Sequence, residues 1–168
     1  MLNPRVRCVI LLLIVFHALD ARAQGHTAGQ GFVAVRGGTN LIGNTYRVRE
    51  ARAVPGAGLS VGTFLSPTWA LELEGWFRTS NPECCANTAE TLVSLSVVRM
   101  YARTGIQPYA LGGLTLLHGH ANQMQVQVGV GAQMPIYRRL AIALDLRGNG
   151  GGSTMIVRPT IAAIYYFH

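Results

Sequence analysis

Several residue types and patterns are scarce in this sequence. Its 168 residues contain no lysine, so all 14 basic residues are arginines, and these form no dense cluster of the kind that binds nucleic acid. Helical periodicity is scarce, and after residue 23 no apolar run approaches the roughly 20 residues that a membrane-spanning helix needs. These absences exclude a helical membrane protein, and we expect no nucleic-acid partner.

The first 23 residues have the pattern of an export signal. Arg5 and Arg7 precede the short apolar run 9–16, and Ala21-Arg22-Ala23 provides small residues at both sides of a cleavage motif. A charged segment, a short apolar segment and an A-x-A site are typical of a secretory signal peptide. We therefore predict a signal peptide at 1–23 and a single domain at 24–168.

Cysteine is also rare, and the two cysteines after residue 23 are the neighbours Cys84 and Cys85. An exported protein meets an oxidising compartment, where a vicinal disulfide or a bond to another chain is allowed. Two reduced thiols at a loop tip are the alternative. No histidine lies nearby in the sequence, so we expect no metal site at this pair.

Strict alternation of polar and apolar residues is the clearest pattern that is present. In 123–133 glutamine and glycine occupy one parity, and methionine, valine and alanine occupy the other; in 140–147 leucine and isoleucine alternate with Ala141, Ala143, Asp145 and Arg147. Successive side chains of a strand point to opposite faces. Two such runs with a short connection predict an antiparallel hairpin with one polar and one apolar face.

The same reading predicts eight strands along the chain. They cover 31–38, 53–65, 67–77, 89–102, 107–118, 123–133, 140–147 and 153–167. Alternation slips at Val97–Val98, which we interpret as a β-bulge. The links after the first and third strands, 39–52 and 78–88, are longer and polar, whereas those after the second, fourth and sixth resemble tight turns. An eight-stranded antiparallel up-and-down β-barrel is the predicted fold.

Such a barrel can be soluble, with its apolar face around a ligand, or transmembrane, with that face toward lipid. Charges of both signs on the polar parity favour the transmembrane form, because a narrow lumen needs its charges paired. The expected charge network in the lumen consists of Arg36, Glu72, Glu74, Arg99, Asp145, Arg147 and Arg158.

Aromatic residues also favour the transmembrane form, because most of them are predicted to lie near one end of the barrel. Rings anchored at a membrane interface form a belt at one height, whereas a soluble core would spread them through its interior. We expect this belt to contain Phe32, Phe64, Trp69, Tyr101, Tyr109, Tyr137, Tyr165, Tyr166 and Phe167.

Two segments carry a family resemblance. The strand 107–114, Gln-Pro-Tyr-Ala-Leu-Gly-Gly-Leu, and the last strand 161–167 resemble strands of small bacterial outer-membrane β-barrels of the OmpA-like type. The resemblance implies an outer-membrane location with periplasmic termini, a monomer, and assembly by the barrel-insertion machinery, which reads the terminal aromatic residue. His168 follows that aromatic and departs from the pattern. We expect no periplasmic domain after the barrel.

Chemistry-bearing residues are few. His118 and His120, with Asn122 beside them and Ser153 on another loop, could imitate a hydrolase or metal site, but the His-x-Ser-Asn pattern of an outer-membrane lipid A deacylase family is missing. Solvated histidines are the simpler interpretation. Arginines in the first long loop could bind lipopolysaccharide phosphates, since arginine binds phosphate bidentately, or could simply be solvated. They are Arg47, Arg49 and Arg52.

The sequence thus predicts a non-enzymatic barrel that contacts outer-membrane lipid and lipopolysaccharide and holds no cofactor. Eight strands leave room for little beyond side chains, so the lumen should be plugged. Envelope integrity or loop-mediated surface interaction is the expected role. A narrow pore, a lipid-modifying enzyme and a soluble ligand-binding barrel remain the alternatives.

Overall fold

The computed structural model describes residues 25–44, 47–78, 90–118, 122–151 and 154–167, without the side chains of 44, 47–52 and 154. In these ranges no helix is long and apolar enough to span a membrane. The predicted signal peptide lies outside the described residues. The strands are β1 (Gly31–Asn44), β2 (Arg47–Ser66), β3 (Trp69–Arg78), β4 (Glu90–Met100), β5 (Gln107–His118), β6 (Gln123–Tyr137), β7 (Leu140–Gly151) and β8 (Thr154–Phe167).

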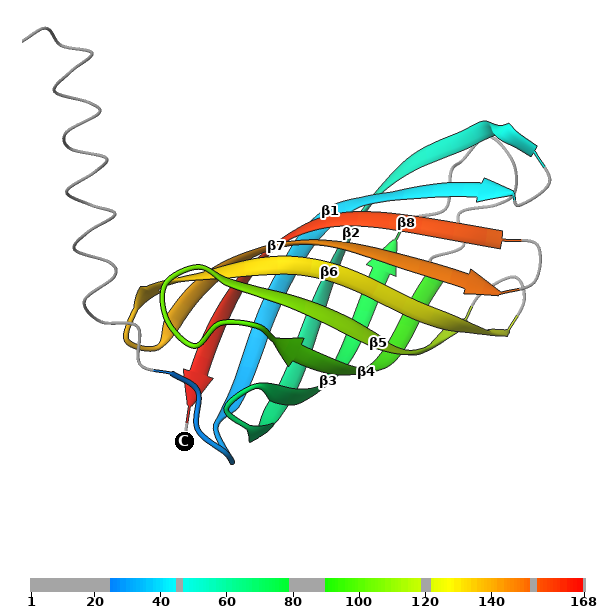
Figure 1. Ribbon diagram of the computed structural model, residues 1–168. Helices are drawn as coiled ribbons and strands as arrows, with labels where there is room; N and C mark the ends of the chain where they lie inside the picture. Colours follow the sequence, from blue (N-terminus) through cyan, green and yellow to red (C-terminus); the bar gives the residue numbers. More distant parts are fainter. Residues whose placement is uncertain (1–24, 45–46, 79–89, 119–121, 152–153, 168) are drawn as a thin grey trace, which may run out of the picture.

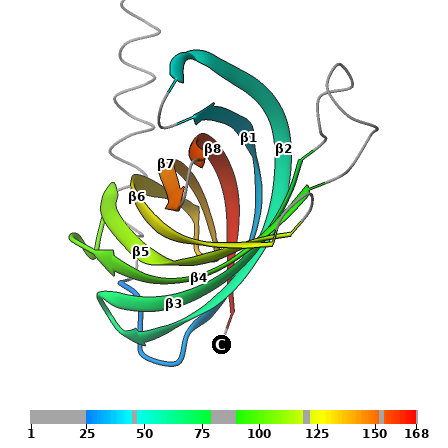
Figure 2. The same ribbon diagram turned by 90° about the vertical axis from the view of Figure 1, so that its right-hand side faces the viewer.

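The eight strands form one closed barrel (Figures 1 and 2). Each strand pairs antiparallel with the next, and β1 closes the sheet on β8, with Gly31 opposite Phe167. Closure pairs the backbone groups that an open sheet would leave free at its edges. The predicted eight-stranded up-and-down barrel is confirmed.

The two ends of the barrel differ. The C-terminal end of β8 lies beside the links 67–68, 101–106 and 138–139, and we call this the turn end (Figure 1). The opposite end, which we call the loop end, carries the projecting β1–β2 hairpin. The prediction of a polar loop at 39–52 is wrong, because β1 and β2 stay paired from Thr39–Pro55 to Ile42–Arg52. Backbone pairing in this projecting part of β1 and β2 does not require one apolar face. A search for alternating apolar residues therefore ends the two strands too early.

Side-chain alternation sets an inner polar face and an outer apolar face. On β6, Gln125 and Gln127 point inward and are at most 1% exposed, whereas Val126 and Val128 point outward and are 59–60% exposed. On β7 the polar parity, including Asp145 and Arg147, is likewise inside. The faces of the predicted hairpin are confirmed, with valine and leucine on the outside.

β4 lacks the bulge that the sequence suggested. Its pairing with β3 runs without interruption from Trp69–Arg99 to Arg78–Glu90. Shifts of register occur instead near strand ends, between Ile42 and Asn44, Phe64 and Ser66, and Pro135 and Tyr137. Because a bulge would have moved Arg99 to the other face, its absence leaves that arginine on the outer wall.

Candidate functional site

The middle of the barrel interior contains a layer of six ionised side chains. Three arginines and three carboxylates contribute, so their formal charges cancel; they are Arg36, Glu72, Glu74, Asp145, Arg147 and Arg158. All six are at most 7% exposed. They come from β1, β3, β7 and β8, since the inward parity of each strand places a charge at this height. We call them the charge layer.

Arg147 is the centre of the charge layer. Its Nη1 donates to Glu72 Oε1 at 2.8 Å and to Glu74 Oε2 at 2.7 Å, and its Nη2 donates to Asp145 Oδ2 at 3.1 Å. Since β7 and β3 lie four strands apart in a barrel of eight, the bonds to Glu72 and Glu74 cross the full width of the lumen, whereas Asp145 lies on the same strand as Arg147. Arginine suits this position because its planar fork binds several carboxylate oxygens at once.

The other two arginines complete the layer. Arg36 donates to Asp145 Oδ2 at 2.7 Å and to Glu72 Oε2 at 2.9 Å. Arg158 donates to Glu74 Oε2 at 2.9 Å, and its guanidinium lies 4.3 Å from the ring centre of Trp76. Every carboxylate of the layer therefore has at least two arginine partners, which offsets the cost of removing charge from water.

Two residues that sequence reasoning missed support Asp145. Tyr109 Oη donates to Asp145 Oδ2 at 2.8 Å, and the Thr160 hydroxyl donates to Asp145 Oδ1. Strand alternation could have identified both residues as inward-facing. Thr160 is on the same face of β8 as Arg158, and Tyr109 is on the same face of β5 as Gln107. Gly131 faces the same spot, where a Cβ would lie 2.6 Å from Tyr109 Cζ and 2.6 Å from Asp145 Cβ.

The aromatic belt was predicted only in part. Trp69, Tyr101, Tyr137, Tyr165 and Phe167 are exposed on the outside at the turn end. Phe32, Phe64, Tyr109 and Tyr166 are instead buried in the interior, so their assignment to the belt is wrong. Each of these four rings is at an inward-facing position of its strand. Alternation along the strand decides whether a ring points inward or outward, whatever its position along the barrel axis. Together the four rings form an aromatic plug at the turn end.

The segment before β1 adds His26 to the aromatic plug. The His26 ring stacks on Phe64 with centroids 4.0 Å apart, and its Nε2 lies 3.0 Å from Gln107 Oε1 and 2.9 Å from Gln133 Nε2. Burial lowers the pKa of His26 against the opposing effect of its glutamine contacts. No strand periodicity covers residue 26, so the sequence offered no signal for this contact.

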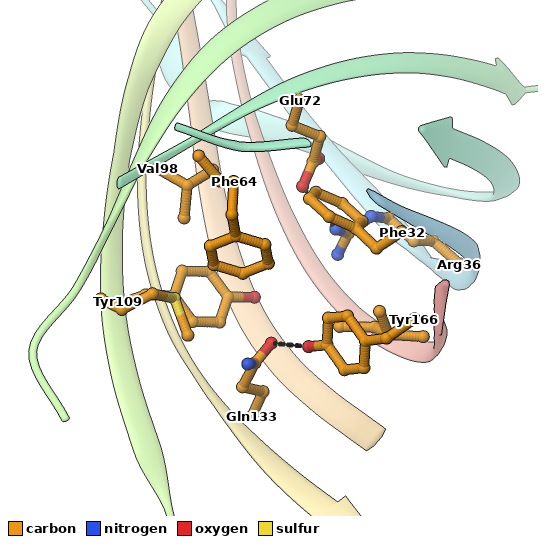
Figure 3. Close-up of a pocket in the computed structure, with 11 residues that line it drawn as sticks. Phe32, Arg36, Phe64, Glu72, Val98, Tyr109, Gln133 and Tyr166 are labelled. Atoms are coloured by element: carbon orange, nitrogen blue, oxygen red, sulfur yellow. Dashed lines mark hydrogen bonds and ion pairs between the residues drawn. The ribbon is translucent and has the colours of Figure 1, made fainter. Parts of the chain in front are cut away.

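A cavity of about 20 Å³ separates the aromatic plug from the charge layer. Figure 3 shows the rings of Phe64, Tyr109 and Tyr166 around it, with Arg36 and Glu72 beyond. The Tyr166 hydroxyl donates to Gln133 Oε1 at 2.8 Å across its lower side. A space of this size holds about one water molecule, which is too small for an organic ligand.

Toward the loop end the interior becomes apolar again. Trp76, Leu92, Leu117 and Ile156 form a buried cluster above the charge layer. Nearer the mouth, Arg78 forms an ion pair with Glu90. From the turn end toward the loop end, the described interior thus carries an aromatic cluster, the charge layer and an apolar cluster, with buried polar side chains such as Gln125, Gln127 and Asn149 among them.

Arg99 does not belong to the charge layer, which corrects the sequence prediction. It is exposed on the outer wall, with its guanidinium 4.7 Å from the centre of the Trp69 ring. The reason is the uninterrupted alternation of β4, which turns Ser94 and Ser96 inward and Arg99 outward. Structure brings together the other six predicted lumen residues.

The remaining candidates form no reactive centre in the described part of the chain. His118 is exposed, and its Nδ1 lies 2.8 Å from Asn122 Oδ1. His120, Ser153, Cys84 and Cys85 lie outside the described residues. No group of three or more His, Cys, Asp or Glu side chains within the described ranges is arranged to hold a metal ion.

The lipopolysaccharide candidates are placed only by their backbone. Arg47, Arg49 and Arg52 belong to the loop-end half of β2, not to a loop. The structure does not describe their side chains.

Known proteins were compared with the chain by sequence and by structure. No protein-family model and no curated protein matches the sequence. Three similar solved structures are Ail, the attachment invasion locus protein of Yersinia pestis (TM-score 0.64, 11% identity, 84% of this chain and 100% of that chain), Neisserial surface protein A (0.66, 11%, 83% and 99%), and the N-terminal β-barrel domain of Pseudomonas aeruginosa OprF (0.60, 16%, 83% and 99%). This chain therefore has the fold of the small eight-stranded outer-membrane β-barrels.

Proposed function

We propose that this chain is a bacterial outer-membrane β-barrel without enzymatic activity, whose lumen is closed by its own side chains. The outer wall supports the location. Among the described residues, 28 large apolar side chains are exposed on it, spread over all eight strands. A soluble monomer rarely exposes an apolar patch of more than a few hundred Å², whereas lipid is the natural solvent for such a wall.

The observation that carries the closed lumen is the span of Arg147. Its bonds to Glu72 and Glu74 join opposite walls of the barrel, with apolar and aromatic layers on either side. An ion would have to break several charge-assisted hydrogen bonds to pass. The role that fits a closed barrel is structural support of the envelope, or surface interaction through the loop end.

Lipopolysaccharide contact through Arg47, Arg49 and Arg52 belongs to the same proposal. The three residues share the part of β2 that projects at the loop end. Ail, which has a similar fold, has been crystallised with the heparin analogue sucrose octasulfate. That example supports the idea that a barrel of this fold can bind a polyanion. Assembly by the barrel-insertion machinery and a monomeric state complete the proposal.

Two experiments test the proposed function. Membrane fractionation and heat-dependent gel mobility in detergent should place the protein in the outer membrane as a folded barrel. Recovery in the soluble fraction would overturn the location. In planar bilayers the wild type should show no steady conductance, and a stable open channel would overturn the closed lumen.

A further inference from the structure

Arg99 is unusual because of where it lies. Among the strand residues whose side chains the structure describes, it is the one arginine or carboxylate on the outer wall. The other ionised side chains of this set point inward or lie at the rim. The outer wall is otherwise apolar, and an arginine facing lipid costs the most free energy at the bilayer midplane and little near the interface. Arg99 is the penultimate residue of β4 at the turn end, where the cost is low.

Two aromatic rings hold the Arg99 guanidinium on the outer wall. It lies 4.7 Å from the ring centre of Trp69, its partner across the β3–β4 pair, and 5.9 Å from that of Tyr101. All three side chains are exposed. A cation within about 6 Å of an aromatic ring is attracted to the ring face. Stacking of this kind leaves the N–H groups free, because they point outward in the guanidinium plane.

Backbone hydrogen bonds fix the three residues relative to one another. Met100 N donates to Thr68 O at 2.8 Å, and Tyr101 N donates to Pro108 O at 2.9 Å. Ser66 Oγ accepts from the backbone N of Trp69 at 3.2 Å. The main chain that carries the two rings and the guanidinium is therefore well hydrogen-bonded. This limits the conformational entropy that the main chain loses when a ligand binds.

The Arg99 guanidinium also lacks an anion of its own within the described part of the chain. Of the carboxylates described there, Glu72, Glu74 and Asp145 lie inside the barrel and Glu90 pairs with Arg78 at the loop end. No hydrogen bond of its guanidinium occurs among the described residues. Its N–H donors, which have no partner among the described residues, match the oxygen atoms of a phosphate, which arginine binds bidentately.

We propose that Arg99, Trp69 and Tyr101 form a binding site for the phosphate group of an anionic phospholipid, whose charge no headgroup cation cancels, at the turn-end interface. Trp69 and Tyr101 lie at headgroup depth with their rings toward the acyl chains, as interfacial aromatics do. Arg99 lies between them and donates to the phosphate oxygens. The site rests on the proposed membrane location and adds a specific lipid contact to it.

Lipid-selective fluorescence quenching tests the site. The chain has two tryptophans, and Trp76 is buried in the lumen, so Trp76→Phe leaves Trp69 as the single reporter beside Arg99. In vesicles of phosphatidylcholine with a minor fraction of brominated phosphatidylglycerol, Trp69 should sense the anionic lipid as enriched about fivefold over brominated phosphatidylcholine. Arg99→Gln should reduce the ratio to about one.

Arg139→Gln is the matched control. Arg139 is also exposed at the turn end, where its Nη1 lies 3.4 Å from Tyr165 Oη, but it belongs to the link between β6 and β7. Its removal subtracts the same charge and should leave the enrichment at Trp69 unchanged. Native mass spectrometry of the protein with both tryptophans, comparing retained phosphatidylglycerol with and without Arg99→Gln, gives a second readout if Trp76→Phe does not fold.

Each outcome decides one of the two proposals. Enrichment that is lost in Arg99→Gln and kept in Arg139→Gln supports the phosphate site. Equal enrichment in both variants, or none in a correctly inserted wild type, overturns the site and leaves the membrane barrel intact. Failure of the wild type to float with vesicles and to show heat-dependent mobility overturns the membrane location, and the phosphate site with it.

Discussion

Arg147 and Glu74 meet across the full width of the barrel, with Nη1 of the arginine 2.7 Å from Oε2 of the glutamate. They come from β7 and β3, which are on opposite sides of the closed sheet. Together with the Arg147–Glu72 pair, it connects two walls that share no backbone hydrogen bonds. The proposed closure of the lumen and the stability of the barrel therefore depend on the same side chains.

Removal of one carboxylate from the charge layer should destabilise the barrel. Glu72→Leu leaves Arg36 and Arg147 each without one partner, and breaking a buried ion pair costs about 3–5 kcal/mol. Urea titration of the folded barrel in detergent, followed by heat-dependent gel mobility, measures the loss. Glu90→Leu, at the partly exposed rim pair with Arg78, should cost less. Equal losses in the two variants would show that the charge layer has no special role.

Filling the space at Gly131 should also destabilise the barrel. Gly131→Ala places a methyl group 2.6 Å from both Tyr109 and Asp145, and relief of such overpacking costs about 1–3 kcal/mol. Gly75→Ala is the control, because no atom lies within 4 Å of its outward Cβ position, and it should change the unfolding free energy by less than about 0.5 kcal/mol. The same urea titration compares the two. A neutral Gly131→Ala would contradict the close packing around Asp145.

Docking of the segment 25–30 should weaken in acid. Burial lowers the pKa of His26, so the undocked state binds the proton more readily, and docking loses free energy as pH falls below about 6.5, the ordinary pKa of histidine. Gly29 N donates to Phe64 O at 2.7 Å, and its hydrogen-exchange protection reports docking. Protection should decrease between pH 7.5 and pH 5 after correction for intrinsic exchange. His26→Gln should remove this dependence, and an unchanged pH profile in that variant would assign it to another group.

The two tryptophans should distinguish the faces of the wall. Trp69 is 39% exposed on the outside, whereas Trp76 is fully buried in the lumen. In vesicles whose acyl chains carry bromine, Trp76→Phe should show strong quenching of Trp69, and Trp69→Phe should show little quenching of Trp76, because bromine quenches only at short range. Similar weak quenching of both would mean that the outer wall does not face lipid.

Local pattern was sufficient for the number of strands and for most of their faces. The glutamines of β6 and the charges of β7 point inward as their alternation predicts, because the two-residue period is a property of the strand itself. Where the period was misjudged, at Val97–Val98, the face of Arg99 was also wrong. The same rule would have placed Phe32, Phe64, Tyr109 and Tyr166 inside, had parity been preferred to their common height.

By itself the sequence determined the number of strands, the polar and apolar faces, and six of the seven residues assigned to the lumen. Only the closed barrel decided which of these residues meet. Glu74 and Arg147 are 73 residues apart, and no local rule relates side chains on opposite walls. Their contact follows from the strand number and stagger that set the width of the lumen. The contacts of His26 with Phe64, Gln107 and Gln133 likewise depend on the tertiary structure, whereas the position of Arg99 beside Trp69 follows from the pairing of the neighbouring strands β3 and β4.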